Sequence, residues 1–202
     1  KVRVCRVPEV KRIRPESSSL GINLFQQQIW WYAYQVPLMA KAGVRWIRPW
    51  LAWENTWNTQ ESVEGRWDPR ALDAALRRME KYGQRYQNIL FHAPSWLTGT
   101  TGWSAPPLDK LDRWTDYVEK VVTRYRGRVR YYEVWNEPDL MWPEATRHSG
   151  EHYLGVLKAA YKAAKRADPN CVVLGLSHAG YENWLVNVGK LRAKDYMDVA
   201  TI

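Results

Sequence analysis

The sequence has few cysteines and no long apolar segment. It contains two cysteines, Cys5 and Cys171, which fix neither a disulfide framework nor a redox compartment. No apolar run approaches the roughly 20 residues that a membrane-spanning helix needs, so no membrane partner is expected. The first residues, KVRVCRVPEVKRIRPESSS, lack the apolar middle of a signal peptide and begin without Met. We therefore expect a processed chain or part of a longer one.

Positive charge exceeds negative charge. Lys and Arg number 30 against 21 Asp and Glu, which gives a formal net charge of +9. Such a balance can indicate a nucleic-acid surface. The basic residues are scattered, however, with the densest groups in the N-terminal segment, at 77–85 and at 124–130. The last two groups sit where a helix ends or a strand begins, which suits a solvated rim. The pattern favours an acidic polymer substrate over nucleic acid, and no nucleic-acid partner is expected.

Apolar or β-branched runs alternate with helical patterns along the chain. This alternation predicts an α/β fold with a parallel sheet and helices on its faces. Gly43, Gly83 and Gly127 each follow a predicted helix, where a left-handed C-cap is expected. The predicted strands are 19–25, 44–48, 87–92, 129–135, 171–176 and 197–202, and the predicted helices are about 28–42, 69–82, 108–125, 150–166 and 181–191.

Two architectures fit this order: an open doubly wound sheet and a (β/α)8 TIM barrel. The stretch after the first strand, GINLFQQQ, lacks the glycine spacing of a phosphate-binding loop. The long segments 49–68 and 93–107 follow strands, as do the loops that build barrel sites. We therefore predict a (β/α)8 barrel, of which residues 19–202 supply strands one to six, and an approach segment or linker at residues 1–18. Completion by a C-terminal segment or a second chain is expected.

The fourth predicted strand ends in Asn136, Glu137 and Pro138. Barrel enzymes present catalytic groups at the C-terminal ends of strands. A carboxyl flanked by Trp135 and Pro138 is partly desolvated, which suits general-acid chemistry, and an amide can recognise a sugar hydroxyl. Strand alternation separates neighbouring side chains, so both can serve one site only if the strand becomes irregular there. By residue type alone, Glu137 could equally be an exposed loop acid.

The tetrapeptide WNEP on a fourth strand resembles the acid/base motif of clan A glycoside hydrolases, which are retaining (β/α)8 enzymes. Other segments look like that clan in the same order, from about residue 19 to 202. The details are most similar to glycoside hydrolase family 39, with family 5 next. The segments that carry the resemblance are SLGIN, VRWIRPWLAWEN, FHAPSW, YYEVWNEPDL, YLGVLKAAYKAAKRADPNCVVLGL and DYMDVATI.

The resemblance implies roles for individual residues. Glu137 would be the general acid/base, and Asn136 would bind the 2-hydroxyl of the sugar at the cleavage point. Arg48 matches the clan's arginine that supports the nucleophile; a buried salt bridge with Glu133 is the alternative, and both can hold. His92 could reach a sugar hydroxyl or serve as a satisfied core histidine.

Tryptophan is abundant, with 13 copies. Large aromatic faces stack on the C–H faces of sugar rings. Trp53, Trp96 and Trp142 are the predicted substrate platforms, with packing inside the loops as the alternative for each. Glu54 is expected to be a loop or rim acid. The tryptophans that follow strands are Trp50, Trp53, Trp57, Trp96, Trp103 and Trp142.

The implied reaction is cleavage of β-linked glycosides, in an oligosaccharide or polysaccharide, by double displacement. Neither a metal nor an organic cofactor is implied. Retaining hydrolysis needs two carboxylates roughly 5–5.5 Å apart. In this clan the nucleophilic Glu ends strand seven, so it is expected beyond residue 202. A polysaccharide substrate would favour an extracellular over a cytoplasmic location.

Three other interpretations remain open. The chain could belong to a carbohydrate-binding protein without turnover, or to a purely structural half-barrel. HSGEH at 148–152 also matches a zinc-protease pattern, H-x-x-E-H. That site needs both histidines on one helical face, whereas Ser149-Gly150 is typical of a helix start and places His148 outside the helix.

Overall fold

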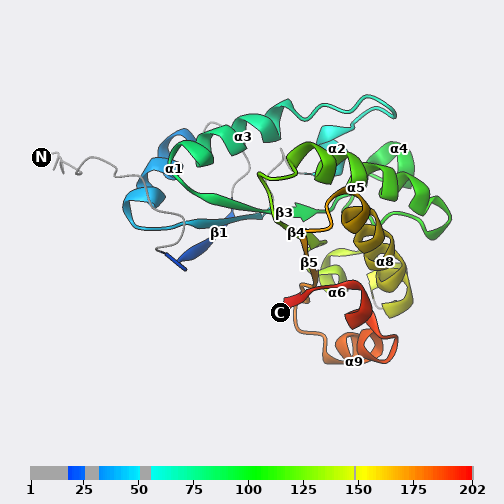
Figure 1. Ribbon diagram of the computed structural model, residues 1–202. Coiled ribbons are helices and arrows are strands. Elements are labelled where there is room, and N and C mark those ends of the chain that lie inside the picture. Colours follow the sequence, from blue (N-terminus) through cyan, green and yellow to red (C-terminus); the bar gives the residue numbers. More distant parts are fainter. Residues whose placement is uncertain (1–17, 26–31, 51–55, 148, 202) are drawn as a thin grey trace, which may run out of the picture.

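The computed structural model describes residues 18–25, 32–50, 56–147 and 149–201. They contain six parallel strands in one curved sheet, and each strand pairs with the next in chain order. This is the (β/α)8 arrangement that the sequence predicts, with six of the eight strands (Figure 1). The predicted segment 1–18 lies outside the described residues except for Ser18. The strands are β1 (Gly21–Phe25), β2 (Trp46–Trp50), β3 (Arg85–Leu90), β4 (Tyr131–Val134), β5 (Val172–Leu176) and β6 (Val199–Thr201).

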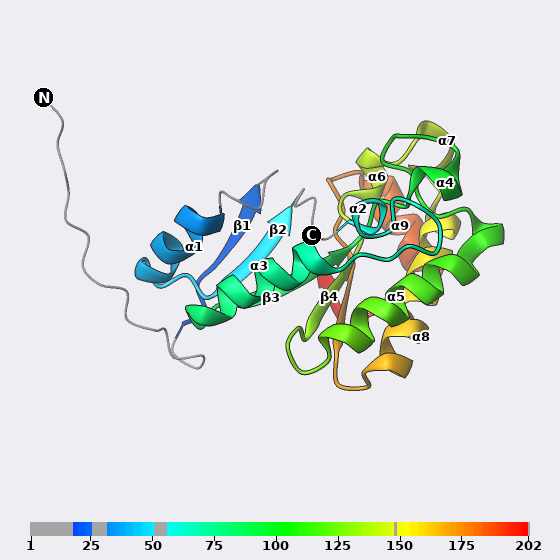
Figure 2. The same cartoon turned by 90° about the horizontal axis from the view of Figure 1, so that it is seen from above.

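Long helices follow the strands and cover the outer side of the sheet. In Figure 1, α3, α5, α8 and α9 succeed one another around that side, and Figure 2 shows α5 beside α8. All five predicted long helices are present. They are α1 (Tyr32–Lys41), α3 (Arg70–Lys81), α5 (Leu111–Tyr125), α8 (Gly150–Ala167) and α9 (Glu182–Lys190).

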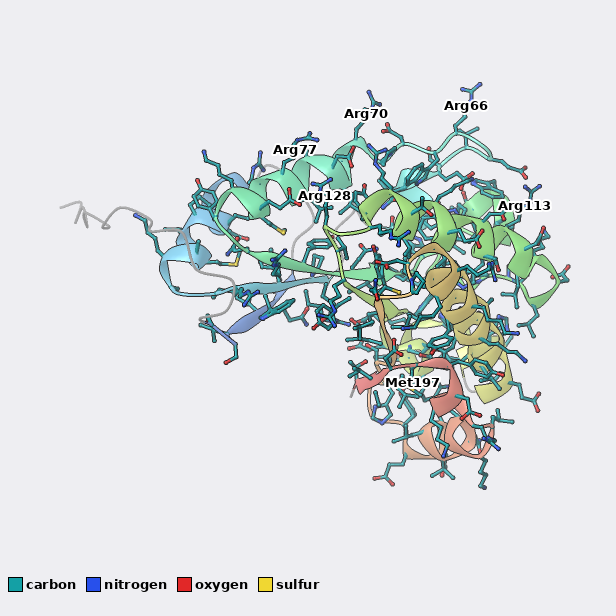
Figure 3. All side chains as sticks on the ribbon, in the orientation of Figure 1. Arg66, Arg70, Arg77, Arg113, Arg128 and Met197 are labelled. Carbon is teal, nitrogen blue, oxygen red and sulfur yellow. The ribbon has the colours of Figure 1, made fainter. Side chains whose placement is uncertain are left out.

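The helices are amphipathic, and this fixes which face packs on the sheet. On α3, Leu72, Leu76 and Met79 recur at helical spacing and are buried. Arg70 and Arg77 of the same helix are exposed and point away from the sheet (Figure 3). The hydrophobic core therefore lies between the helices and the outer face of the sheet.

A group of polar side chains lies on the inner face of the sheet. Asn23 of β1 pairs in register with Arg48 of β2. The side chains of Arg48 and Gln87 both donate hydrogen bonds to the carboxylate of Glu133. The outward residue Tyr132, next to Glu133, is fully buried under the helices. Strand alternation thus places Tyr132 on the outer face and gathers Arg48, Gln87 and Glu133 on the inner face, where Ile89 and Leu174 stand in register with Glu133.

Short helices that the sequence patterns did not predict lie after β2, β3 and β4 and, for η4, before β6, whereas η3 falls within the predicted helix 108–125. Four residues are too few to display a 3.6-residue period, which explains the omission. Gly43, Gly83 and Gly127 have positive φ angles of 82°, 74° and 78°, as expected for left-handed C-caps. In the described part of the chain, no helix is long and apolar enough to cross a bilayer. The short elements are α2 (Trp57–Gln60), α4 (Ser95–Thr98), α6 (Pro138–Met141), α7 (Glu144–Arg147) and the 3-10 helices η3 (Leu108–Lys110) and η4 (Ala193–Tyr196).

Candidate active site

The backbone is unusual where β3, β4 and β5 end. Within the described residues, six non-glycine residues have a positive φ angle, and five of these end one of those strands or lie within three residues of its end. Each such residue costs on the order of 1–3 kcal/mol, and the surrounding structure must impose it. Backbone strain of this kind concentrates at functional sites, so it points to the C-terminal ends of the strands. The five are His92 (61°), Trp135 (70°), Glu137 (48°), Leu176 (76°) and Ser177 (45°).

The left-handed Trp135 breaks the alternation of β4. Glu133 faces inward, and regular alternation would turn Trp135 inward as well. Instead the Trp135 ring lies 6.2 Å from the ring of Trp114 on the outer helix α5. Asn136 then returns to the inner side, where its Oδ1 accepts a hydrogen bond from Arg48. The predicted irregularity of the strand is present. It lies at Trp135, three residues before Pro138, which begins α6.

Arg48 joins the inner polar groups. Its Nε donates to Glu133 Oε2 at 2.6 Å and its Nη2 donates to Glu133 Oε1 at 2.9 Å. Nη2 also donates to Asn136 Oδ1 at 2.6 Å and to Ser177 Oγ at 3.2 Å. Gln87 Nε2 adds a donor to Glu133 at 2.7 Å. The salt bridge between Arg48 and Glu133, one of the two predicted roles of Arg48, is therefore formed, and Glu133 is 1% exposed.

Glu137 lies at the N-cap of α6 and is half-buried. Its backbone N–H donates to the carbonyl of Ser177 at 2.7 Å, which ties the end of β4 to the end of β5. Its carboxylate forms no hydrogen bond or ion pair with any other described residue. The half-buried carboxylate is therefore not committed to any neighbour within the described part of the chain.

His92 follows β3 and is buried, with 8% of its surface exposed. Its ring stacks on Trp103 at 4.7 Å and bonds to the backbone of Gly102. Burial lowers the pKa of this imidazole from its ordinary value of 6.5. These contacts match the predicted alternative of a core histidine, at the same end of the sheet as Glu137.

The lowered pKa of His92 predicts a pH dependence of stability. Well above pH 6.5 the imidazole is neutral in both the folded and the unfolded chain. As the pH falls below 6.5, the unfolded chain takes up the proton first, so stability is lost until the lowered folded-state pKa is reached. We expect His92→Gln to remove this loss, as measured by urea unfolding between about pH 5 and pH 8. The prediction would be contradicted if the free energy of unfolding changed with pH in the same way in both proteins.

The predicted tryptophan platforms differ in their placement. Trp142 is 1% exposed and packs against Trp135, His152 and Tyr153, so in this structure it is a core residue with no free face for a sugar. Trp96 is partly exposed, and its Nε1 donates to the carbonyl of Glu61 at 2.7 Å. Trp53 and Glu54 lie outside the described residues.

The residues of the zinc-protease pattern make structural contacts at the start of α8. Ser149 is the N-cap of α8 and its side chain accepts a hydrogen bond from the His152 N–H, as the predicted helix start requires. The His152 ring bonds to the carbonyl of Pro106 at 2.9 Å. His148 lies outside the described residues, and the described part of the chain holds no cluster of three metal-ligating side chains.

A cavity of about 900 Å³ lies at the opposite end of the strands. Its walls include Trp46, Arg85 and Tyr131, which begin β2, β3 and β4. None of the predicted site residues lines it. Barrel enzymes carry their active sites at the C-terminal ends of the strands, so we assign the candidate site to the strand ends around Glu137.

The model of the family described as glycosyl hydrolase family 10 matches residues 52–178, more than half of the chain. The chain belongs to glycosyl hydrolase family 10. The match contains β3, β4, β5 and the WNEP segment. The resemblance to clan A glycoside hydrolases that the sequence motifs indicate is thereby confirmed.

Solved structures of other glycoside hydrolases share the fold of this family 10 chain. A family 39 enzyme from Bacteroides cellulosilyticus has a TM-score of 0.74 at 20% identity, covering 97% of this chain and 40% of its own. A family 39 β-xylosidase from Caulobacter crescentus has a TM-score of 0.62 at 20% identity, covering 92% of this chain and 46% of the xylosidase. Xylanase 10B from Thermotoga maritima has a TM-score of 0.61 at 20% identity, with 89% and 58% covered.

The chain thus spans between 40% and 58% of the length of these relatives. The comparison with curated proteins gives no significant match. At these identities the structural likeness establishes the fold, and it includes the family 39 enzymes to which the motifs are most similar.

The structure adds two residues that the sequence reasoning did not select. Ser177 follows β5 and contributes its carbonyl to Glu137 and its hydroxyl to Arg48. Asp139 is fully buried two residues after Glu137. Serine after a strand and an acid after a proline are both common in loops, so no sequence signal marked either residue.

Proposed function

We propose that the protein carrying this chain is a retaining glycosidase that cleaves β-linked glycosides by double displacement. One observation carries the proposal: the Glu137 carboxylate has no partner among the described residues and stands beside Asn136 at the C-terminal end of β4. Membership of a glycosyl hydrolase family supports it.

Glu137 would act twice in this reaction. It first protonates the oxygen of the leaving group, and it later removes a proton from the water that attacks the glycosyl-enzyme. A half-buried carboxyl on a fixed backbone can meet both demands, because it is accessible and does not need to be repositioned between the steps.

Asn136 would hold the sugar through its amide N–H groups. Arg48 is a donor only, so its bond to Asn136 Oδ1 fixes the amide with Nδ2 as the free end. The only described contact of Nδ2 is with the sulfur of Met141 at 3.6 Å, a weak acceptor that a sugar 2-hydroxyl would displace. Arg48 would also support the nucleophile, as the resemblance implies, and His92 and Trp96 would lie at the edge of the site.

Double displacement needs a second carboxylate roughly 5–5.5 Å from the first. We propose that this nucleophilic Glu ends strand seven, beyond residue 202, in a continuing segment or a completing chain. Residues 19–202 would then be the first part of the barrel, with 1–18 as an approach segment or linker.

The substrate would be an oligosaccharide or polysaccharide. Two structural relatives are named as a xylosidase and a xylanase, so β-xylosides are the first choice of test substrate. β-Glucosides, β-galactosides and β-mannosides complete the panel.

The test is hydrolysis of this panel of aryl β-glycosides by the full-length protein, followed by NMR of the first product. We expect release of the aryl alcohol with the β-anomer of the sugar formed first. Initial formation of the α-anomer would exclude double displacement. Sugar binding without hydrolysis would favour the non-catalytic carbohydrate-binding alternative.

A further inference from the structure

Asp139 lies in the first turn of α6, two residues after Glu137, and none of its surface is exposed. Its carboxylate accepts hydrogen bonds from the backbone N–H of Ala179, at 2.9 Å to Oδ1 and 3.0 Å to Oδ2. It also accepts one from the N–H of Tyr181 at 3.3 Å. A buried carboxylate cannot touch a sugar, so any part that it plays in the reaction must act through other residues.

The segment that Asp139 holds is the turn between β5 and α9. Leu176, which ends β5, and Ser177 have φ angles of 76° and 45°, and Gly180 has a φ angle of 118°. Glycine adopts a positive φ freely, but the left-handed backbone of Leu176 and Ser177 keeps its shape only where other groups fix it. Tyr181 is the N-cap of α9, so the Asp139 carboxylate also lies at the positive end of that helix dipole.

The same turn positions Glu137. The carbonyl of Ser177 accepts the Glu137 N–H at 2.7 Å, and the Ser177 N–H donates to the carbonyl of Thr201 on β6 at 2.8 Å. The hydrogen bonds and the chain form a closed circuit: from Glu137 to Ser177, along the turn to Ala179, across to Asp139, and back through Pro138. The left-handed backbone of Glu137 is part of this circuit.

We infer that Asp139 is a positioning residue for Glu137: its buried carboxylate clamps the β5–α9 turn, which holds the backbone of the general acid/base. This inference rests on the proposed function. It assigns Asp139 no contact with substrate. It predicts that loss of the clamp lets Glu137 shift away from the leaving-group oxygen.

The test compares two glycosides of one sugar in the full-length protein. An alkyl glycoside needs protonation of its leaving group, whereas a 2,4-dinitrophenyl glycoside does not, because its phenolate leaves unaided. Asp139→Asn keeps the shape but places an amide N–H₂ against the N–H donors of the turn. We expect kcat/KM on the alkyl glycoside to fall roughly 10²-fold, the cost of a displacement of about 1 Å. The value on the dinitrophenyl glycoside should change far less.

Asp73→Asn is the matched control. Asp73 is also a buried carboxylate, but it binds Arg124 and Tyr125 between α3 and α5. Its loss should weaken the fold without changing the ratio of the two kcat/KM values. In the Glu137→Gln background, Asp139→Asn should cause no further loss on the alkyl glycoside, because the acid it positions is already absent.

The ratio of the two kcat/KM values in Asp139→Asn distinguishes a positioning role from a structural one. An equal fall on both substrates, or no fall, would overturn it and leave Asp139 a structural residue. If Asp139→Asn does not fold, Asp139→Glu keeps the charge with a longer reach, and it should show the same selective loss to a smaller degree. If the unsubstituted protein hydrolyses neither glycoside, the proposed function fails, and the inference fails with it.

Discussion

Glu137→Gln is expected to lower kcat/KM on substrates with poor leaving groups by roughly 10²–10⁴-fold, the usual contribution of general acid–base catalysis. Glutamine has nearly the same size and can still form hydrogen bonds, but it has no acidic proton to give. Because Glu137 is half-buried and its carboxylate binds no described residue, the fold should tolerate the change. The measurement is steady-state kinetics on alkyl and aryl β-glycosides with the full-length protein.

Two further observations would separate this role from a general disturbance. Sodium azide should restore turnover of Glu137→Gln on a dinitrophenyl glycoside and give a β-glycosyl azide, since the small anion attacks the glycosyl-enzyme without base assistance. Glu182→Gln, at an exposed acid in the first turn of α9, should behave like the unsubstituted protein. Unchanged turnover of Glu137→Gln on alkyl glycosides would refute the assignment of the acid/base.

Arg48→Met is expected to lower the free energy of unfolding by about 3–5 kcal/mol, the usual cost of removing one partner of a buried ion pair. The change leaves Glu133, which is 1% exposed, with Gln87 as its remaining described hydrogen-bond donor. It also releases Asn136 and Ser177 from the guanidinium. Methionine keeps most of the aliphatic volume, so the loss reports the charge and hydrogen bonds rather than a cavity. Urea unfolding of the full-length protein measures it.

Arg113→Met provides the surface comparison. Arg113 pairs with Glu64 at 2.9 Å, but the two side chains are 51% and 55% exposed, and Figure 3 shows Arg113 on the outside of the molecule. Exposed pairs contribute roughly 0–1 kcal/mol. If Arg48→Met costs no more than Arg113→Met, the inner polar network does not stabilise the fold as argued.

The sequence predicted the strands and long helices because their periodicity is local. Burial at helical spacing on α3 and apolar runs such as β5 are visible in any short window of the chain. The salt bridge from Arg48 to Glu133 could also be anticipated, since parallel strands bring inward side chains to one level. These features depend on residue types and spacing alone.

Other features could not be predicted, because they depend on backbone conformation and distant contacts. The positive φ of Trp135 runs against the preference of a bulky residue, so no pattern indicates it. The partners of Asp139 are backbone N–H groups some 40 residues away. Nearly every residue carries such a group, so the sequence does not indicate which of them will bind the carboxylate. Trp142 and Trp96 look alike in the sequence, but the first is enclosed and the second is partly exposed.

The chain-order pairing of the strands has a consequence for how the protein is made. A ribosome releases β1 first, and each later strand finds its hydrogen-bonding neighbour already synthesised. Parallel sheets are slow to assemble when their pairings span long loops, but among the six described strands every pairing joins one βα unit to the next. This part of the sheet can therefore grow strand by strand during translation, with the helix of each unit covering its outer face as it emerges.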